Sequence, residues 1–577
     1  MELFHLSVAT AISLFAPAET IHRILEEWTR YAVMFEHHSA LDAYIGQTSV
    51  VTQLSWVGFD VQTRYEHLLR ISSLAPDASV YACLKNSPAL AVEFLETFRS
   101  ILFSQTLSLR SQQHELRASH PSLASELERI GKAIEMRSFG NRAPLKEFDR
   151  FNPDIDRRHH ETLDLHTLGE EWDEVVLQIR NVPGYESFLQ TPSVESLCQA
   201  ANNGPVVMIV ASEKHEACYA IVIFGPSAND IQSTKLPLTI PKAEELSKRF
   251  NTNLFSAHLR KANTGTDYLQ HEAGRGVKQK GKVSSECPKL GSYAVLKELW
   301  ELVMQPVIEL VETHSPAFCK DGLLHIWLVV AGILSSLPLH AAGIYEPDGT
   351  TVDRCCVLDR VICSYAPSLS ALNRKPPSEL LSETKLFAFG GGQGLSAASK
   401  EVEAVRSICS PKMTVSVASA HATPEGIKKE MQNAHIVHFA CHGTQDLANP
   451  LRSRLEFSKS SKIEVEELMS EPMPNARLAV LLACETAQGD QRLTEESLHL
   501  AGTMLFAGFY GAVGTLWKME DQDGPIVCEE FYKRLLEEDK EVVQYFKAGE
   551  ALHRAVRKLK ESGAHVLRWA SFVHIGR

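Results

Sequence analysis

The sequence lacks any apolar run long enough to cross a membrane, although 44% of its 577 residues are hydrophobic. It also lacks an excess of positive charge, because 58 Lys and Arg stand against 71 Asp and Glu, for a formal net charge of -13. This balance argues against nucleic acid or an anionic membrane as the main partner. The start of the chain lacks the basic residues of a secretory leader, since Glu2 comes first and no Lys or Arg precedes Arg23. We therefore expect a soluble, cytoplasmic protein.

Cysteine pairs at metal-binding or redox spacing are also absent. The twelve cysteines include no Cys-x-x-Cys, and two of them, Cys355 and Cys356, are adjacent. A chain of this length needs no disulfide staples, so most cysteines are expected to be reduced, buried and small hydrophobic residues. No metal or other cofactor is expected. A single exception is nevertheless enough to supply a catalytic nucleophile.

Residues 1–140 are predicted to be α-helical. Their apolar positions recur at spacings of three and four, as in the stretch Ala91–Arg110, which is predicted to be one helix with a broad apolar face. Pro76, Pro88 and Pro121 mark joints between helices. No repeat with a period of about 34 residues is visible, so the residue pattern alone does not indicate a helical repeat.

Three further parts follow along the chain. Residues 141–259 are predicted to be a connecting α+β region, in which two apolar runs around a polar turn indicate a hairpin at Gly204–Gly225. Residues 260–288 are polar, basic and aperiodic, which is typical of a flexible linker. Residues 289–577 alternate short apolar strands with helices. That pattern predicts an α/β domain with a mainly parallel sheet covered by helices on both faces.

Two reactive side chains end two of these predicted strands. His442 follows the apolar run of HIVHFACHG, and Cys484 follows the apolar run of LLACETAQGD. Active groups of parallel sheets gather at the carboxyl ends of strands, so neighbouring strands would bring the two side chains face to face. A histidine beside a cysteine withdraws the thiol proton and leaves the thiolate as a nucleophile. The N–H groups of Gly443 and Cys484 are predicted to form an oxyanion hole.

Carboxylates near these motifs are candidates for selecting a side chain of the substrate. There are four of them in the predicted substrate pocket: Asp446, Glu485, Asp490 and Asp521. Residues 485–490 are predicted to form a polar loop beside the nucleophile. The pattern does not choose among the four, so the charge of the preferred substrate residue stays open.

Other features near the motifs have simpler interpretations. His438 is expected to be a hydrogen-bonded core residue on the same side of a regular strand as His442, with Cys441 in the core on the opposite side. One strand cannot present both of its faces to one metal ion, so a zinc site within His435–His442 is not favoured. Gly390–Gly392 lacks the spacing of a phosphate-binding loop and is interpreted as a turn at a strand end.

Several spaced motifs together resemble the CHAT domain, a caspase-like module often joined to tetratricopeptide repeats. They are LPLHAAGIY (Leu337–Tyr345), SYAPSLSAL (Ser364–Leu372), SKEVEAV (Ser399–Val405), HFACHG (His438–Gly443), LLACETAQGD (Leu481–Asp490), the segment Ser497–Gly524 and WASFVHIG (Trp569–Gly576). The resemblance covers residues from about 290 to 577. It implies a caspase–separase fold and a peptidase whose catalytic histidine and cysteine match His442 and Cys484.

The preceding regions resemble parts of fungal CHAT proteins. The stretch EWDEVVLQIRNVPGYESFL, followed by GPVVMIV, has this likeness, and residues 50–137 are similar to degenerate tetratricopeptide repeats. Helical repeats generally bind other proteins. The resemblance therefore implies a regulatory protein partner for the helical region.

Three functions fit the sequence. The first is a cytosolic cysteine endopeptidase, in which Cys484 attacks the scissile carbonyl of a protein substrate, His442 moves the proton, and the peptide lies extended along the sheet. The second is a non-catalytic protein-interaction scaffold, although a scaffold does not need both reactive residues. The third is an acyltransferase or thioesterase with the same pair, which would need a deep ligand pocket. The motifs favour the endopeptidase.

Overall fold

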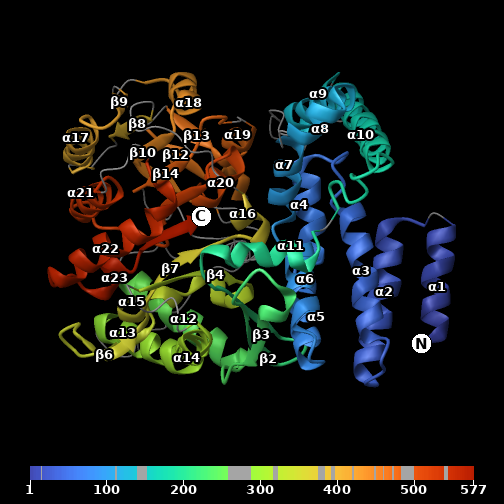
Figure 1. The fold of residues 1–577 in the computed structure, drawn as a ribbon, viewed down its shortest axis with the longest axis horizontal. Coiled ribbons are helices and arrows are strands. Elements are labelled where there is room, and N and C mark those ends of the chain that lie inside the picture. The colour runs from blue at the N-terminus through green and yellow to red at the C-terminus, as the bar shows by residue number, and fades with distance from the viewer. Residues whose placement is uncertain are drawn as a thin grey trace, which may run out of the picture.

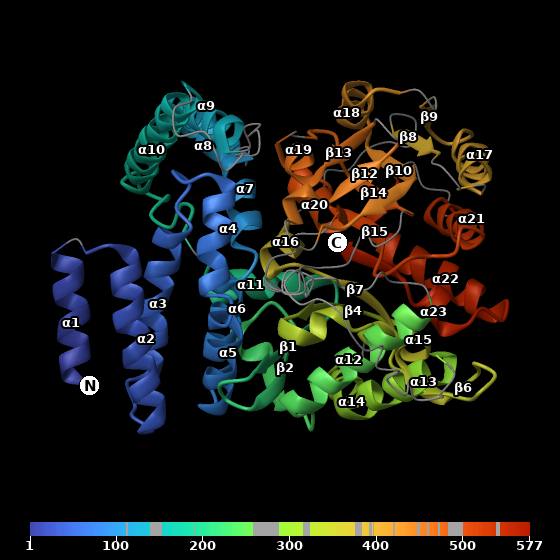
Figure 2. The ribbon, with the colours of Figure 1, turned by 180° about the vertical axis from the view of Figure 1, so that it is seen from behind.

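The structure is a computed structural model of the 577-residue chain. It describes residues 1–14, 16–110, 114–138, 153–190, 192–257, 288–315, 323–374, 384–391, 395, 397–418, 422–446, 450–458, 461–470, 473–482, 500–537 and 543–577. Within these ranges, no helix is both long enough and apolar enough to span a lipid bilayer. Figure 1 shows a helical part beside an α/β part, and Figure 2 shows the same two parts from behind.

The N-terminal part consists of helices that pack side by side (Figure 1). In α2 (Ala18–Met34), the residues Ile21, Leu25, Trp28 and Ala32 recur every three or four positions and are all buried, so one face of this helix packs against its neighbours. The other helices are α1 (Glu2–Ser13), α3 (Ala40–Leu54), α4 (Val61–Arg70), α5 (Leu74–Leu84), α6 (Pro88–Phe98), α7 (Ile101–Arg110), α8 (His114–Ser119), α9 (Pro121–Ser138) and α10 (Pro153–Arg180). The prediction of an all-α N-terminal region is confirmed.

One sheet of eleven strands forms the centre of the α/β part. In spatial order its strands are β3 (Ile231–Lys235), β2 (Ala217–Ile223), β1 (Val206–Ser212), β4 (Leu324–Val330), β7 (Val361–Tyr365), β16 (Phe572–Gly576), β15 (Gly511–Thr515), β14 (Leu478–Leu481), β10 (Ile436–Ala440), β8 (Lys385–Gly390) and β9 (Thr414–Val417). Every residue of β10, β14, β15 and β16 is buried. These strands are mostly apolar because helices cover both faces of the sheet.

The remaining elements cover the sheet and its edges (Figures 1 and 2). The helices are α11 (Val194–Cys198), α12 (Ile240–Ser256), α13 (Pro288–Leu299), α14 (Gln305–His314), α15 (Val357–Arg360), α16 (Leu369–Asn373), α17 (Ala398–Cys409), α18 (Pro424–Asn433), α19 (Val465–Ser470), α20 (Leu500–Ala507), α21 (Asp523–Leu535), α22 (Ala548–Glu561) and α23 (Val566–Trp569). Two small antiparallel sheets pair β5 (Gly343–Tyr345) with β6 (Thr351–Cys356), and β11 (His442–Thr444) with β12 (Arg454–Glu456) and β13 (Lys462–Glu464). The prediction of a mainly parallel sheet sandwiched by helices is confirmed.

The central sheet contains two parallel blocks that run in opposite directions, and the strands β1, β2 and β3, each antiparallel to the next, extend it beyond β4. β4, β7 and β16 are parallel to one another, and so are β15, β14, β10, β8 and β9. The blocks meet at β15 and β16, which pair antiparallel. The carboxyl ends of the two blocks therefore lie at opposite edges of the sheet. We call the side of the sheet at which the carboxyl ends of β10 and β14 lie the β10 edge, and the side at which those of β4 and β7 lie the β4 edge. Neither name refers to an outermost strand.

The division of the chain into four predicted parts stays a prediction. β1 and β2 pair as an antiparallel hairpin within residues 204–225, and β1 pairs in parallel with β4. Of the predicted linker, residues 260–287 lie outside the described part of the chain.

The helical part is attached to the β4 edge. Arg99 Nη2 donates a hydrogen bond to the carbonyl oxygen of Val330 at the end of β4, over 3.0 Å. Ser100 Oγ donates one to the carbonyl oxygen of Pro367, which follows β7, over 2.9 Å. Both donors are buried. Because buried polar groups are costly to leave unpaired, these contacts fix the helical part on the sheet.

The stretch Ala91–Arg110 is not one helix, as its apolar spacing predicts. α6 ends at Phe98 and α7 begins at Ile101, and Ser100 between them has a positive φ of 48°. A non-glycine residue rarely adopts such a backbone conformation without support from its surroundings. Here the hydrogen bonds of the Arg99 and Ser100 side chains to the ends of β4 and β7 supply that support. Tertiary contacts therefore outweigh the local helical pattern.

Glu96 makes a further contact at the β4 edge, and its loss is expected to destabilise the protein. Its carboxylate accepts the N–H groups of Leu369 and Ser370 at the start of α16, each over 2.9 Å. Glu96→Gln keeps one acceptor oxygen but turns an NH₂ group towards the other N–H. We expect the free energy of unfolding, measured by urea denaturation, to fall by about 1.5–3 kcal/mol. The exposed carboxylate Glu66 of α4 is the control, and an equal loss in Glu66→Gln would contradict this explanation.

Candidate active site

Two neighbouring strands lead to the predicted catalytic residues. β10 and β14 pair in parallel, with Ile436 opposite Leu478 and Phe439 opposite Leu481. Both strands are buried along their whole length. Parallel neighbours lie roughly 4.8 Å apart. The two strands therefore end side by side at the β10 edge, as the sequence predicts.

His442 does not continue β10 as a regular strand. β10 ends at Ala440, the chain bends at Cys441, and His442 begins β11, opposite Glu456 of β12. The prediction that His438 and His442 share one face of a single strand is therefore wrong. Cys441 is buried, as predicted. His442 is only half-buried, which suits a residue that has to meet a substrate.

Three of the predicted site residues lie outside the described part of the chain: Cys484, Glu485 and Asp490. In sequence, Cys484 follows Leu481 by three positions, and His442 follows Phe439, the residue paired with Leu481, by the same three. Each candidate residue therefore follows one member of the pair Phe439 and Leu481 by the same number of positions. Their proximity in space stays a prediction.

The other two predicted carboxylates belong to segments at the β10 edge. Asp446 follows β11, is half-buried, and donates its N–H to Ser453 Oγ over 3.0 Å. Asp521 follows β15, and its Oδ2 accepts the N–H of Ala397, a residue beyond the end of β8, over 2.9 Å. β14 and β10 lie between β15 and β8 in the sheet. Asp521 thus joins two segments that flank the strands of the candidate pair. Gly443 lies in β11 next to His442.

A buried hydrogen-bond network around His438, four residues before His442, joins β10 to α17 and α21. His438 Nε2 lies 2.9 Å from Glu401 Oε1, and the Tyr532 hydroxyl lies 3.2 Å from His438 Nδ1. All three side chains are buried, with Glu401 only 3% exposed. A neutral imidazole with its proton on Nε2 satisfies both contacts, since it donates to Glu401 and accepts from Tyr532. Burial raises the pKa of the Glu401 carboxyl.

The sequence predicts half of this network. His438 is a hydrogen-bonded core residue, as expected, but nothing in the sequence pairs it with Glu401 or Tyr532. The one signal is that Glu401 interrupts the otherwise apolar buried face of α17, which also includes Val402 and Val405. A carboxylate on such a face needs a buried partner, although the pattern does not say which one.

Four buried cysteines in the described part of the chain are poor candidates for the nucleophile. Burial raises the pKa of Cys83, Cys218 and Cys409 to about 12 and that of Cys198 to about 11. A thiol with so high a pKa is protonated at neutral pH, and the thiolate is the attacking species. All nine described cysteines are free of disulfides. Cys484 remains the candidate that its sequence motif indicates.

Two other features near the motifs have roles in the fold. Among the described residues, no group of three or more His, Cys, Asp and Glu side chains is arranged to hold a metal ion. His435 lies at the amino end of β10, where its Nδ1 accepts the N–H of Lys385 over 2.9 Å. Gly390 ends β8 against α17, and a Cβ there would lie 2.7 Å from the carbonyl oxygen of Ala398. This glycine therefore serves the close packing of helix on strand.

The motif Leu337–Tyr345 lies away from the candidate site, because it follows β4 at the opposite edge. Its histidine, His340, is buried, with Nδ1 2.9 Å from the Tyr365 hydroxyl and Nε2 3.0 Å from the carbonyl oxygen of Ala570. Burial lowers the pKa of His340 to about 4. Both ring nitrogens are used to join β7 to the segment before β16, so this motif serves the fold.

A family model and several solved structures are similar to parts or all of the chain. Residues 293–577 match the family model of the CHAT domain. Two separase chains in separase–securin complexes of Saccharomyces cerevisiae are 13% and 12% identical over 99% of this chain and 45% and 46% of theirs, each with a TM-score of 0.40. The Arg-specific cysteine proteinase gingipain R is 12% identical over 48% of this chain and 67% of its own, with a TM-score of 0.33. This chain spans less than half of the separase chains. It matches no curated protein.

Proposed function

Because residues 293–577 are a CHAT domain, we propose that the protein is a cysteine endopeptidase that cleaves protein substrates with the pair His442 and Cys484. His442 takes the proton of the Cys484 thiol, and the thiolate attacks the scissile carbonyl carbon. The N–H groups of Gly443 and Cys484 stabilise the resulting oxyanion. His442 returns the proton to the leaving amine, and water then hydrolyses the acyl-enzyme.

The pairing of β10 with β14 is the observation that carries this proposal. Their parallel register ends with Phe439 opposite Leu481, and each candidate residue follows its member of this pair by three positions. Parallel sheets place active groups at such carboxyl ends. The half-buried state of His442 supports a catalytic role, since the buried imidazoles of His438 and His340 have both ring nitrogens engaged in the fold.

Substrate selection is proposed to involve carboxylates of the β10 edge. Asp446 and Asp521 lie in segments at this edge, and Glu485 and Asp490 follow Cys484 in sequence. A carboxylate that lines the pocket for the residue before the cleaved bond would favour Lys or Arg there, because opposite charges attract strongly where water is excluded.

The helical part is proposed to bind a regulatory protein and to act through α20. It is attached at the β4 edge, which lies opposite the candidate site. However, α7 also contacts α20, and α20 begins 16 positions after Cys484 in sequence. Arg374, just after α16, donates hydrogen bonds to the carbonyl oxygens of Gly508 and Phe509, just after α20, over 3.0 and 3.2 Å. A movement of the helical part would therefore be transmitted through α20 to the segment that follows Cys484 in sequence.

The test of the proposed function combines peptide cleavage with alkylation. We expect the purified protein to cut members of a diverse peptide library, with the cut sites read by mass spectrometry, and Cys484→Ala to cut none. Iodoacetamide at pH 6.5 should label Cys484 selectively, because a thiol paired with imidazole is ionised below the usual pKa of about 8.5. The buried cysteines described above supply the internal control, since their raised pKa values protect them.

The outcomes separate the endopeptidase from the alternatives. Cleavage by the wild type alone supports the proposal and identifies the preferred residue. Cleavage that persists in Cys484→Ala contradicts it. Absence of cleavage together with an inert Cys484 would favour the non-catalytic scaffold. Selective labelling without peptide cleavage would favour either an acyl-transferring enzyme or a peptidase that needs its regulatory partner. A second assay with a library of small thioesters distinguishes these two possibilities.

A further inference from the structure

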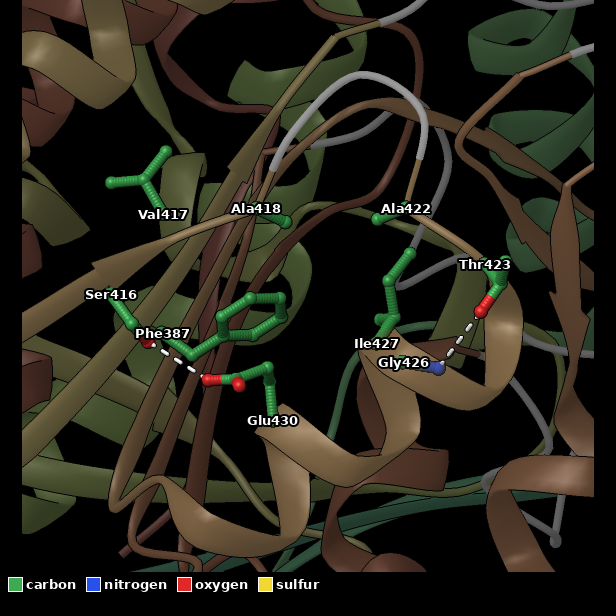
Figure 3. Close-up of a pocket in the computed structure, with 9 residues that line it drawn as sticks. All are labelled: Phe387, Ser416, Val417, Ala418, Ala422, Thr423, Gly426, Ile427 and Glu430. Atoms are coloured by element: carbon green, nitrogen blue, oxygen red, sulfur yellow. Dashed lines mark hydrogen bonds between the residues drawn. The ribbon is translucent and has the colours of Figure 1, made fainter.

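A pocket lies between the end of the central sheet and α18, away from the candidate active site (Figure 3). Its volume is about 270 Å³, slightly below the roughly 300–1,000 Å³ of small-molecule sites. The lining comes from β8, from β9 with its next residue, and from α18 with the residues before it. A pocket of this size beside a strand suits a side chain of a bound peptide better than a whole ligand.

The walls of this pocket are apolar, and one carboxylate faces into it. Phe387 of β8 and Ile427 of α18 provide buried apolar surface. Glu430 extends from α18 towards β9, where Ser416 Oγ donates a hydrogen bond to its Oε2 over 3.2 Å (Figure 3). Among the described residues, no Lys, Arg or His forms an ion pair with Glu430. Apolar walls with an unneutralised carboxylate fit Arg or Lys, whose side chains combine an aliphatic stem with a cationic end.

Among the described strands, the one beside the pocket is paired on one side only. β9 is the last strand at this end of the sheet, and β8 is the one described strand that pairs with it. Thr414 and Ala418 donate their N–H groups to β8 and its preceding residue. Since alternate residues direct their backbone groups to opposite sides, Val415 and Val417 direct theirs away from the sheet. At the other end of the sheet, by contrast, β3 contacts α6.

From these features we infer that β9 and the pocket bind an extended segment of a partner protein. The segment adds to β9 as a further strand, and one of its Arg or Lys side chains lies in the mouth of the pocket with its cation at the exposed carboxylate of Glu430. In such strand addition, main-chain hydrogen bonds supply affinity, and a pocket for one side chain supplies selectivity. β9 lies at the periphery in both views (Figures 1 and 2), two strands away from β10. The site is therefore additional to the proposed peptidase chemistry.

The test uses the full chain with Cys484→Ala, so that no bound peptide is cut and the result does not depend on the proposed catalysis. Acetylated heptapeptides, randomised at every position, are passed over the immobilised protein, and the retained peptides are sequenced by mass spectrometry. We expect Arg or Lys to be enriched at one position. A fluorescein-labelled consensus peptide then reports Kd by anisotropy. Glu430→Gln is expected to raise Kd about tenfold, which corresponds to the loss of about 1.4 kcal/mol.

Two controls identify the site and the binding mode. Glu425→Gln removes an exposed carboxylate of the first turn of α18 that does not line the pocket, and Kd should stay the same. N-methylation of the peptide at alternate positions removes N–H groups that face β9 and should weaken binding about tenfold, whereas methylation at the intervening positions should not. Three outcomes would each overturn the inference: no retained peptide, basic enrichment that persists in Glu430→Gln, or methylation effects without a two-residue period.

Discussion

Replacing His442 with alanine is expected to lower kcat/KM for a library-derived peptide by about 10⁴-fold or more. Without the imidazole, no group removes the proton of the Cys484 thiol or returns it to the leaving amine. Cys484→Ala removes the nucleophile and should lose at least as much. Because the two residues act as one unit, the double variant should lose no more than Cys484→Ala alone. The measurement is cleavage of a fluorogenic version of the peptide by the four proteins.

His435 offers a matched control for this experiment. It lies just before the amino end of β10, where its Nδ1 accepts the N–H of Lys385. His435→Ala therefore removes an imidazole at the opposite end of the same strand and should leave kcat/KM almost unchanged. If His442→Ala keeps its activity while Cys484→Ala loses it, the assignment of the base is wrong. A loss in the double variant that equals the product of two separate losses would show that the residues act independently.

Glu401→Ala is expected to cost about 3–5 kcal/mol of the free energy of unfolding, the largest stability effect predicted here. The carboxylate is buried and accepts the hydrogen bond of His438 Nε2. Its removal leaves a buried N–H without an acceptor and a cavity between α17 and β10. Both consequences are expensive, because water cannot reach the imidazole to replace the lost bond. Urea denaturation, followed by tryptophan fluorescence, measures the change.

Glu403 is the control, because it lies on the same helix and is exposed. Glu403→Ala should alter the free energy of unfolding by less than about 0.5 kcal/mol. Glu401→Gln keeps an oxygen that can accept from His438, so its cost should lie between those of the two alanine variants. Equal stability of Glu401→Ala and Glu403→Ala would mean that the buried contact contributes nothing.

The strands of the candidate site could be predicted because they are short and almost entirely apolar, with His438 as the one polar residue. The runs before His442 and Cys484 correspond to β10 and β14, and their burial follows from helices on both faces of the sheet. Such local patterns need no knowledge of distant residues. That β10 and β14 are neighbours, by contrast, was an assumption of the sequence argument, and the pairing of Phe439 with Leu481 confirms it.

Features that depend on distant partners were not predicted. The bend at Cys441 places His442 in a sheet with β12 and β13, which the apolar pattern of β10 does not foreshadow. The break at Ser100 depends on a carbonyl group of Pro367, far along the chain. The opposite directions of the two blocks depend on how β15 and β16 pair. In each case the deciding interaction is tertiary, and periodicity reports only which residues are buried.

The position of β16 has a consequence for synthesis of the protein. Residues 572–576 form this strand, and it lies between β7 and β15, in the interior of the sheet. A chain emerging from the ribosome at about 5–20 residues per second makes every other strand first. Until β16 arrives, β7 and β15 each present an unpaired edge, and exposed edges of apolar strands are templates for aggregation. A nonsense mutation before this strand would thus leave two separate half-sheets for chaperones and proteases.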